Sequence, residues 1–199
     1  MNGINLLEKP EGLPVFQALL ASELDGGKKT AVWIDARNEA STYALRHQGG
    51  PGILEKVDIG RAFTPLQHHD LIHQLEEFIE DSTEVLVLPN VDFSYTDGQL
   101  SDWEAQELFQ ETWEKIKEIQ KKYGLKVLLS LHSPQKLDYN PNLDIENEIE
   151  VRSTDEGLKY QSDDFDQYAY RDGRHIQTMI PYWREKSTDK VQVKTEVRH

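Results

Sequence analysis

Short apolar runs separated by helical patterns constrain the fold of this chain more than any other feature. Each run is rich in Val, Ile and Leu and is too short for a helix, which is typical of strands buried on both faces of a sheet. The runs cover residues 31–35 (AVWID), 56–60 (KVDIG), 84–90 (EVLVLPN) and 125–132 (LKVLLSLH). Strands that alternate with helices predict an α/β fold with a mostly parallel sheet between two helical layers.

Two of the intervening segments carry helical signals. Between the second and third runs, an apolar stripe at helical spacing is surrounded by His and Glu residues, which predicts an amphipathic helix. The stripe consists of Leu71, Ile72, Leu75, Phe78 and Ile79. A longer helix is predicted to begin after Ser101, which forms a capping-box pattern with Glu104, and to end at Gly124. Its expected core face is Ala105, Leu108, Phe109, Thr112, Ile116, Ile119 and Tyr123.

The pattern changes after Pro134. A polar connection is followed by alternating segments, and Asp172-Gly173 is a strong hairpin signal between two of them. These features predict a C-terminal antiparallel meander that extends the sheet. A chain of 199 residues is expected to form a single domain (1–199), with an α/β core over 1–133 and the polar connection and meander over 134–199.

The charge balance limits the partners that are expected. Acidic residues outnumber basic ones by 36 to 22, a net charge of −14, so direct binding to nucleic acid is not expected. Proteins of salt-adapted archaea share this acidic balance. The chain has no cysteine, which excludes disulfides and cysteine-ligated zinc. No window has the ~20 apolar residues of a membrane helix, and no signal peptide is visible, so we expect a cytoplasmic protein without membrane contact.

The segment from Thr30 to His132 resembles the core of the RecA/RadA-like recombinase ATPases, including their KaiC-like archaeal members. WIDAR at 33–37 is similar to the strand end that reads I-D-T-E in that family, and GRAF at 60–63 is similar to the following A-R-A-F segment. The order of strands and helices is also similar. The resemblance implies a three-layer RecA-like core, and it implies where ATP-binding residues would lie.

At those positions, the residues do not suit ATP. A phosphate loop needs glycines with free N–H groups, a Lys, and a Ser or Thr for magnesium. The best register places the loop at residues 9–16, where Gly12 agrees with the family, but Pro14 replaces the final glycine, Val15 the lysine and Phe16 the hydroxyl residue. The sequence therefore predicts a degenerate phosphate loop, no ATP hydrolysis and no cofactor. GGKKT at 26–30 precedes a strand instead of following one, and is interpreted as a basic turn.

Two further family positions are altered. The catalytic glutamate aligns with Arg37, which cannot act as a base, and the magnesium-side aspartate aligns with Pro89. Because open parallel sheets bind ligands at the carboxyl ends of their strands, a remodelled pocket could still exist there. Its candidate residues are Asp35, Arg37, Asn90, Asp92, Ser130 and His132. The alternative is that Asp35 and Arg37 pair with each other or cap nearby helices.

Three histidines invite a metal interpretation. His69 and His73 lie four residues apart and could chelate together, with His68 beside them. The sequence offers no third ligand of defined geometry, so solvent-facing histidines that flank the amphipathic helix are expected instead.

The leading hypothesis is a catalytically inactive RecA/RadA-like paralogue that binds protein as a regulatory or assembly factor, in DNA recombination or repair. Its expected partner is a RadA-like recombinase or a second copy of the chain. The alternative is a sensor that binds a nucleotide or other small anion at the strand ends through Arg37 without hydrolysing it. A metal-dependent hydrolase that uses the histidines is a third hypothesis.

Overall fold

Parallel strands form the centre of the molecule. The computed structural model describes residues 3–8, 13–133, 136–137, 145–155, 157–162, 165–172, 175–178 and 182–183, with side chains as far as residue 162. The central strands are β1 (Ile4–Glu8), β2 (Thr30–Asp35), β3 (Val57–Arg61), β4 (Thr83–Leu88) and β5 (Lys126–Leu129). They lie in the order β1-β5-β4-β2-β3, and all their pairings are parallel. The predicted α/β class and mostly parallel sheet are confirmed.

The C-terminal strands extend this sheet beyond β1. β6 (Asn147–Thr154) runs parallel to β1, and β7 (Gly157–Gln161) and β8 (Phe165–Asp172) follow it in antiparallel order. β9 (His175–Thr178) and β10 (Tyr182–Trp183) both pair with β8, and Asp172 lies opposite His175 as a hairpin requires. The expected meander is confirmed, and the described residues place ten strands in one sheet. The last of the alternating segments, at 190–197, lies outside the described residues.

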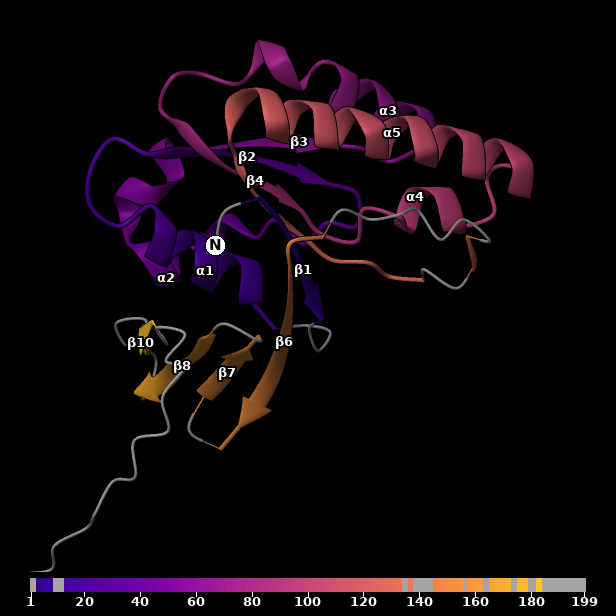
Figure 1. The fold of residues 1–199 in the computed structure, drawn as a ribbon. Coiled ribbons are helices and arrows are strands. Elements are labelled where there is room, and N and C mark those ends of the chain that lie inside the picture. The colour runs from indigo at the N-terminus through magenta and orange to yellow at the C-terminus, as the bar shows by residue number, and fades with distance from the viewer. Residues whose placement is uncertain are drawn as a thin grey trace, which may run out of the picture.

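Helices cover both faces of the parallel strands (Figure 1). α1 (Val15–Glu23) and α2 (Thr42–Gly49) lie on one face, followed by the 3-10 turn η1 (Pro51–Glu55). α3 (Pro65–His73) and α5 (Asp102–Tyr123) lie on the other, with the turn η2 (Leu75–Glu77) and the short α4 (Phe93–Thr96). Among the described residues, no helix is long and apolar enough to cross a membrane.

The strands alternate between two hydrophobic cores, as a period of two residues requires. On β2, Trp33 belongs to the core under α1, and its neighbours Val32 and Ile34 belong to the core under α3 and α5. On β4, Val87 belongs to the core under α1 and Leu88 to the core under α3 and α5. The central strands are therefore buried on both faces, which explains why they are continuous apolar runs in the sequence.

The long helix begins and ends as predicted. Ser101 Oγ accepts the backbone N–H of Glu104, the Glu104 side chain bonds back to Ser101, and Gly124 ends the helix with φ 66°. The expected core face is correct for Ala105, Phe109, Thr112, Ile116 and Ile119, which are buried. It was wrong for Tyr123, which is 38% exposed, and it omitted the fully buried Trp113.

The other predicted helix is shorter than its apolar stripe. α3 ends at His73, and Leu75 continues in the 3-10 turn η2. A 3-10 turn has three residues per turn instead of 3.6, so residues beyond it leave the helical stripe. Phe78 was expected in the core but is 46% exposed.

Candidate functional site

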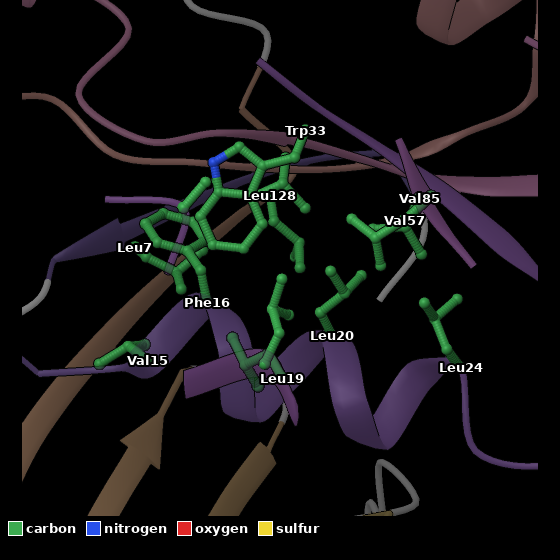
Figure 2. Packing of buried hydrophobic residues seen from close by; sticks show 14 of the residues in the cluster. Leu7, Val15, Phe16, Leu19, Leu20, Leu24, Trp33, Val57, Val85 and Leu128 are labelled. Carbon is green, nitrogen blue, oxygen red and sulfur yellow. The ribbon is translucent and has the colours of Figure 1, made fainter. Parts of the chain in front are cut away.

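The residues at the start of α1 belong to the hydrophobic core. Val15 and Phe16 are 0% and 1% exposed, and both pack in the core under α1. The Phe16 ring meets Trp33 of β2 edge-on at a centroid distance of 6.0 Å. Figure 2 shows the Phe16 side chain directed from α1 towards Trp33, beside Leu7. Two positions that the resemblance assigns to a phosphate-binding lysine and a magnesium-binding hydroxyl therefore contribute to packing.

The backbone before α1 is also engaged. The N–H of Val15 donates to the carbonyl of Leu13 at 2.8 Å, and Pro14 has no N–H to offer. Pro14 stands at the N-cap of α1 without a side-chain cap hydrogen bond. Two of the backbone positions that a phosphate loop would direct at its ligand are thus unable to donate. Gly12 lies outside the described residues.

Asp35, at the end of β2, holds the loop that follows its own strand. Its Oδ1 accepts the backbone N–H groups of Arg37 at 3.3 Å and Glu39 at 2.9 Å, and its Oδ2 accepts that of Ala40 at 2.9 Å. Arg61 Nε of the neighbouring β3 lies 4.0 Å from Oδ2. Because the carboxylate is 1% exposed and faces four donors, it stabilises the loop geometry.

Asp92 makes an equivalent connection between β4 and β5. The carboxylate is fully buried, and it accepts the backbone N–H of His132 at 2.6 Å and that of Ser133 at 2.7 Å. Each oxygen therefore satisfies one amide of the segment that follows β5. This aspartate lies close to the position where the resemblance places a magnesium ligand, but its two oxygens already bind backbone.

Asn90 joins three segments at the same edge. Its backbone has φ 50°, a left-handed conformation that Asn tolerates better than most residues. Its N–H donates to Ser130 Oγ at 2.9 Å, and its side-chain amide donates to Glu39 Oε1 at 2.6 Å. The carbonyl of Glu39 in turn accepts from Gln17 Nε2 of α1 at 2.7 Å. These bonds link the ends of β2, β4 and β5 to the first turn of α1.

Arg37 lies on the solvent side of this edge. Its Nη1 is 3.0 Å from His132 Nδ1, and its guanidinium lies 5.2 Å from the centroid of the Phe93 ring. Arginine only donates, so His132 accepts this hydrogen bond through Nδ1. The His132 ring also meets Phe93 edge-on at 5.3 Å. The exposed charge is therefore held against an aromatic surface at the strand ends.

All six predicted edge residues lie at one end of the sheet, joined by hydrogen bonds into one network. Asp35 and Asp92 accept backbone N–H groups of the loops at the strand ends, whereas the alternative interpretation had Asp35 and Arg37 pair with each other or cap nearby helices. The guanidinium of Arg37 points to His132, although its backbone N–H does bond to Asp35. Sequence reasoning missed Glu39 and Phe93, which contribute to the same network. No pattern in the sequence identified Glu39 or Phe93 as members of this network.

The histidines do not converge on a common point. His68 was expected to face solvent but is 1% exposed, and its Nδ1 bonds to Tyr95 Oη at 2.9 Å. The rings of His69 and His73 stack at 4.0 Å, with His69 Nε2 bonded to Glu111 at 3.1 Å. Within the described residues, no group of three or more His, Asp or Glu side chains is arranged to hold a metal ion.

The GGKKT segment lies in the turn between α1 and β2. Gly26 and Gly27 have φ of 73° and 90°, and Lys29 pairs with Glu84 of β4 at 2.8 Å. This agrees with the interpretation as a basic turn.

The chain matches no protein-family model and no curated protein sequence.

Proposed function

We propose that this chain is a RecA-like protein that does not hydrolyse ATP and that acts by binding another protein, as a regulatory or assembly factor. The proposal combines the sequence resemblance with two features of the structure. The first is that the residues at the positions needed for hydrolysis are packed in the core or are bonded to backbone amides. The second is the outermost strand β3, whose outer side no described strand covers, with the exposed apolar side chains of Phe63 and Leu66 just after it.

The loss of hydrolysis is supported by what the relevant groups contact. Phosphoryl transfer relies on positioned cations and donors around the phosphates, each contributing several kcal/mol. Here Val15 and Phe16 are in the core, and Asp35 and Asp92 accept five backbone N–H groups between them. Freeing either carboxylate for magnesium would leave buried amides without acceptors, which costs about 1–3 kcal/mol each.

One observation carries the protein-binding function: two large apolar side chains are exposed beside the outermost strand. β3 is the last strand at its side of the sheet, and Phe63 and Leu66, which follow it, are 73% and 58% exposed. The two residues are three positions apart in the sequence, and exposed apolar groups that form a patch are typical of protein interaction sites. In the part of the chain that the structure describes, no strand pairs with the outer side of β3.

The backbone of β3 has hydrogen-bonding groups to offer on that outer side. The carbonyl of Lys56 and the N–H of Ala62 bond inwards, to Ala31 and Asp35 of the β2 segment. Since N–H and C=O of one strand residue point to the same side and successive residues alternate, Val57, Ile59 and Arg61 direct theirs outwards. An extended segment of a partner can add there as a further strand, with an apolar residue against Phe63.

The preferred partner, from the resemblance, is an active RadA-like recombinase, and a second copy of this chain is the other option. The test measures binding of the purified protein to a purified RecA-like recombinase of the same source by calorimetry, with sedimentation to detect self-association. Phe63→Ala and Leu66→Ala should weaken binding at least about tenfold, a central hot-spot effect. Tyr43→Ala is the matched control, because Tyr43 is 80% exposed on the opposite helical layer. Absence of both interactions at micromolar protein would reject the proposal.

A second candidate function, anion binding at the strand ends, is favoured by the exposed Arg37 beside Phe93 and His132. A guanidinium with an aromatic neighbour suits a phosphate attached to a base. Calorimetry with ATP, ADP and cyclic nucleotides separates the two functions, since only a sensor gives heat and a thermal shift. Steady magnesium-dependent phosphate release that disappears in Asp92→Asn or Arg37→Ala would contradict both.

A further inference from the structure

The outer edge of β3 has two faces that differ in chemistry. Side chains alternate along a strand, and Ile59 packs against the core under α1. Asp58 and Gly60 therefore face the α3 side of the sheet. A Cβ added at Gly60 would lie 2.8 Å from Ile34 and 3.7 Å from Leu71, which belong to the core on that side. At Gly60 the edge thus presents the partly buried Leu71 in place of a side chain of its own.

Asp58 is an exposed carboxylate in the middle of this edge. Within the described residues, no hydrogen bond or ion pair engages its side chain. The two cations of the same segment are bonded elsewhere. Lys56 donates to two carbonyls of the turn after α1 at 2.9 and 3.2 Å, and Arg61 donates to two oxygens of the loop after β2 at 2.7 and 2.8 Å. The charge of Asp58 is therefore open to a partner.

Apolar groups follow this charge along the edge. Beyond Gly60, with Leu71 over it, come the exposed side chains of Phe63 and Leu66. In an added strand, the residue beside Asp58 and the residue beside Gly60 would both face α3, and the residue between them would lie beside Ile59 on the other face. The three consecutive positions therefore suit a cation, an apolar residue and a second, larger apolar residue.

We propose that the β3 edge binds an extended segment of another protein that carries a Lys or Arg next to two apolar residues. This inference rests on the proposed protein-binding function and names the chemistry of its partner. Opposite charges on neighbouring strands attract and like charges repel, so Asp58 admits a basic segment and rejects an acidic one. In an antiparallel pairing of two copies centred on Ile59, Asp58 would lie opposite Gly60 of the second copy and would stay unneutralised.

The test uses two synthetic peptides with blocked ends, Thr-Val-Lys-Val-Phe-Val-Thr and its reverse, which place Lys beside Asp58 in parallel and in antiparallel pairing. Hydrogen exchange of the ¹⁵N-labelled full chain is measured with each peptide. At a concentration about ten times the dissociation constant, one of them should slow exchange of the Ile59 and Arg61 amides about tenfold. These N–H groups point outwards, whereas those of Asp58 and Gly60 point towards β2 and should not change.

A charge reversal tests the role of Asp58. Glutamate in place of the peptide lysine should weaken binding about fivefold, because one cross-strand pair changes from opposite to like charge. Asp58→Lys should reverse this preference. Glu107→Lys, at an exposed position of α5, is the control and should leave the preference unchanged.

Equal affinities for the lysine and glutamate peptides, or unchanged Ile59 and Arg61 exchange at about 2 mM peptide, would overturn this inference. If a recombinase binds and the peptides do not, the inference fails while the proposed function stands. If the peptides bind and the recombinase does not, the basic recognition is supported and the preferred partner is wrong. Self-association that Asp58→Lys abolishes, without peptide binding, would assign the edge to a second copy instead.

Discussion

The buried carboxylate of Asp92, beyond the end of β4, accepts the backbone N–H of His132, beyond the end of β5, at 2.6 Å. The second oxygen accepts the N–H of Ser133 at 2.7 Å. A side chain that binds two consecutive backbone amides fixes the direction in which the chain leaves β5. His132 is thereby placed where it can accept from Arg37.

Asp92→Asn should destabilise the fold by about 1.5–3 kcal/mol, the range for hydrogen bonds to charged groups. Asparagine has only one oxygen, so its NH₂ group would face one of the two buried N–H donors. Urea denaturation monitored by circular dichroism measures the change. Asp81→Asn, at an exposed position, should change the free energy of unfolding by no more than about 0.5 kcal/mol. Equal effects of the two substitutions would mean that the Asp92 bonds contribute nothing.

Substitution of two phenylalanines should distinguish a ring that packs in the core from a ring that is exposed for binding. Phe16 is 1% exposed and Phe63 is 73% exposed. Phe16→Ala removes a ring that contacts Trp33 and should cost about 3–5 kcal/mol of stability. Phe63→Ala should change stability by less than about 0.5 kcal/mol, while it weakens partner binding. Thermal unfolding of both variants, with binding measured for the second, provides the comparison. Loss of stability in Phe63→Ala would instead assign this ring to the fold.

The sequence predicted the regular elements better than the contacts at the strand ends. The runs around Trp33 and Val87 were recognisable because strands buried on both faces carry no polar residue to interrupt them. β1 was not among those runs, since it contains Asn5, whose side chain is buried and donates to the carbonyls of Gly3 and Val127. A polar residue with such distant partners looks like a loop residue in sequence.

The candidate site could be predicted as a set of residues but not as a network. Parallel topology brings Asp35, Asn90 and Ser130 to one edge, and this follows from the order of the strands. What each group binds depends on backbone geometry dozens of residues away. Asp92 illustrates this, because its partners are amides 40 and 41 residues further along the chain. The same limitation explains the error at His68, whose burial depends on Tyr95 and Thr112.

His68 should make the stability of the protein depend on pH. Burial, with a smaller contribution from His69, lowers the pKa of His68 to about 4. The unfolded chain takes up this proton near pH 6.5 and the folded chain only near pH 4, so protonation favours unfolding. Above pH 6.5, titration of His68 does not reduce the free energy of unfolding. As the pH decreases from 6.5 to about 4, the free energy of unfolding falls by about 1.36 kcal/mol per pH unit, about 3 kcal/mol in total.

Denaturation at several pH values tests this, with His68→Phe as the variant. The variant should lose stability at pH 7, because Tyr95 Oη loses its bond to the ring, but its stability should decline less between pH 6.5 and 4. His47→Asn, at an exposed position, is the control and should keep the slope of the original chain. Parallel pH profiles for His68→Phe and the original chain would show that His68 is not the titrating group.

Glu76 should contribute stability in a more acidic range. Its carboxylate bonds to Lys115 at 2.8 Å, to Lys122, and to Tyr123 Oη at 3.1 Å, joining η2 to α5. Hydrogen bonds from Lys115 and then Lys122 lower the pKa of Glu76 to about 2. Because this folded-state pKa lies below that of the unfolded chain, the contribution is complete above about pH 4.5 and is lost as the pH falls towards 2.

Glu76→Gln should therefore lower the melting temperature at pH 7 and have little effect near pH 2, where the original side chain is also protonated. The ion pairs of Glu76 with Lys115 and Lys122 are close to solvent, so about 0.5 M NaCl should reduce the difference in melting temperature at pH 7. Glu77→Gln, one residue further along at an exposed position, is the matched control and should change the melting temperature less at every pH. Scanning calorimetry of the three proteins measures all of these differences. A Glu76→Gln effect that persists unchanged at pH 2 would show that the side chain acts through its shape and not through its charge.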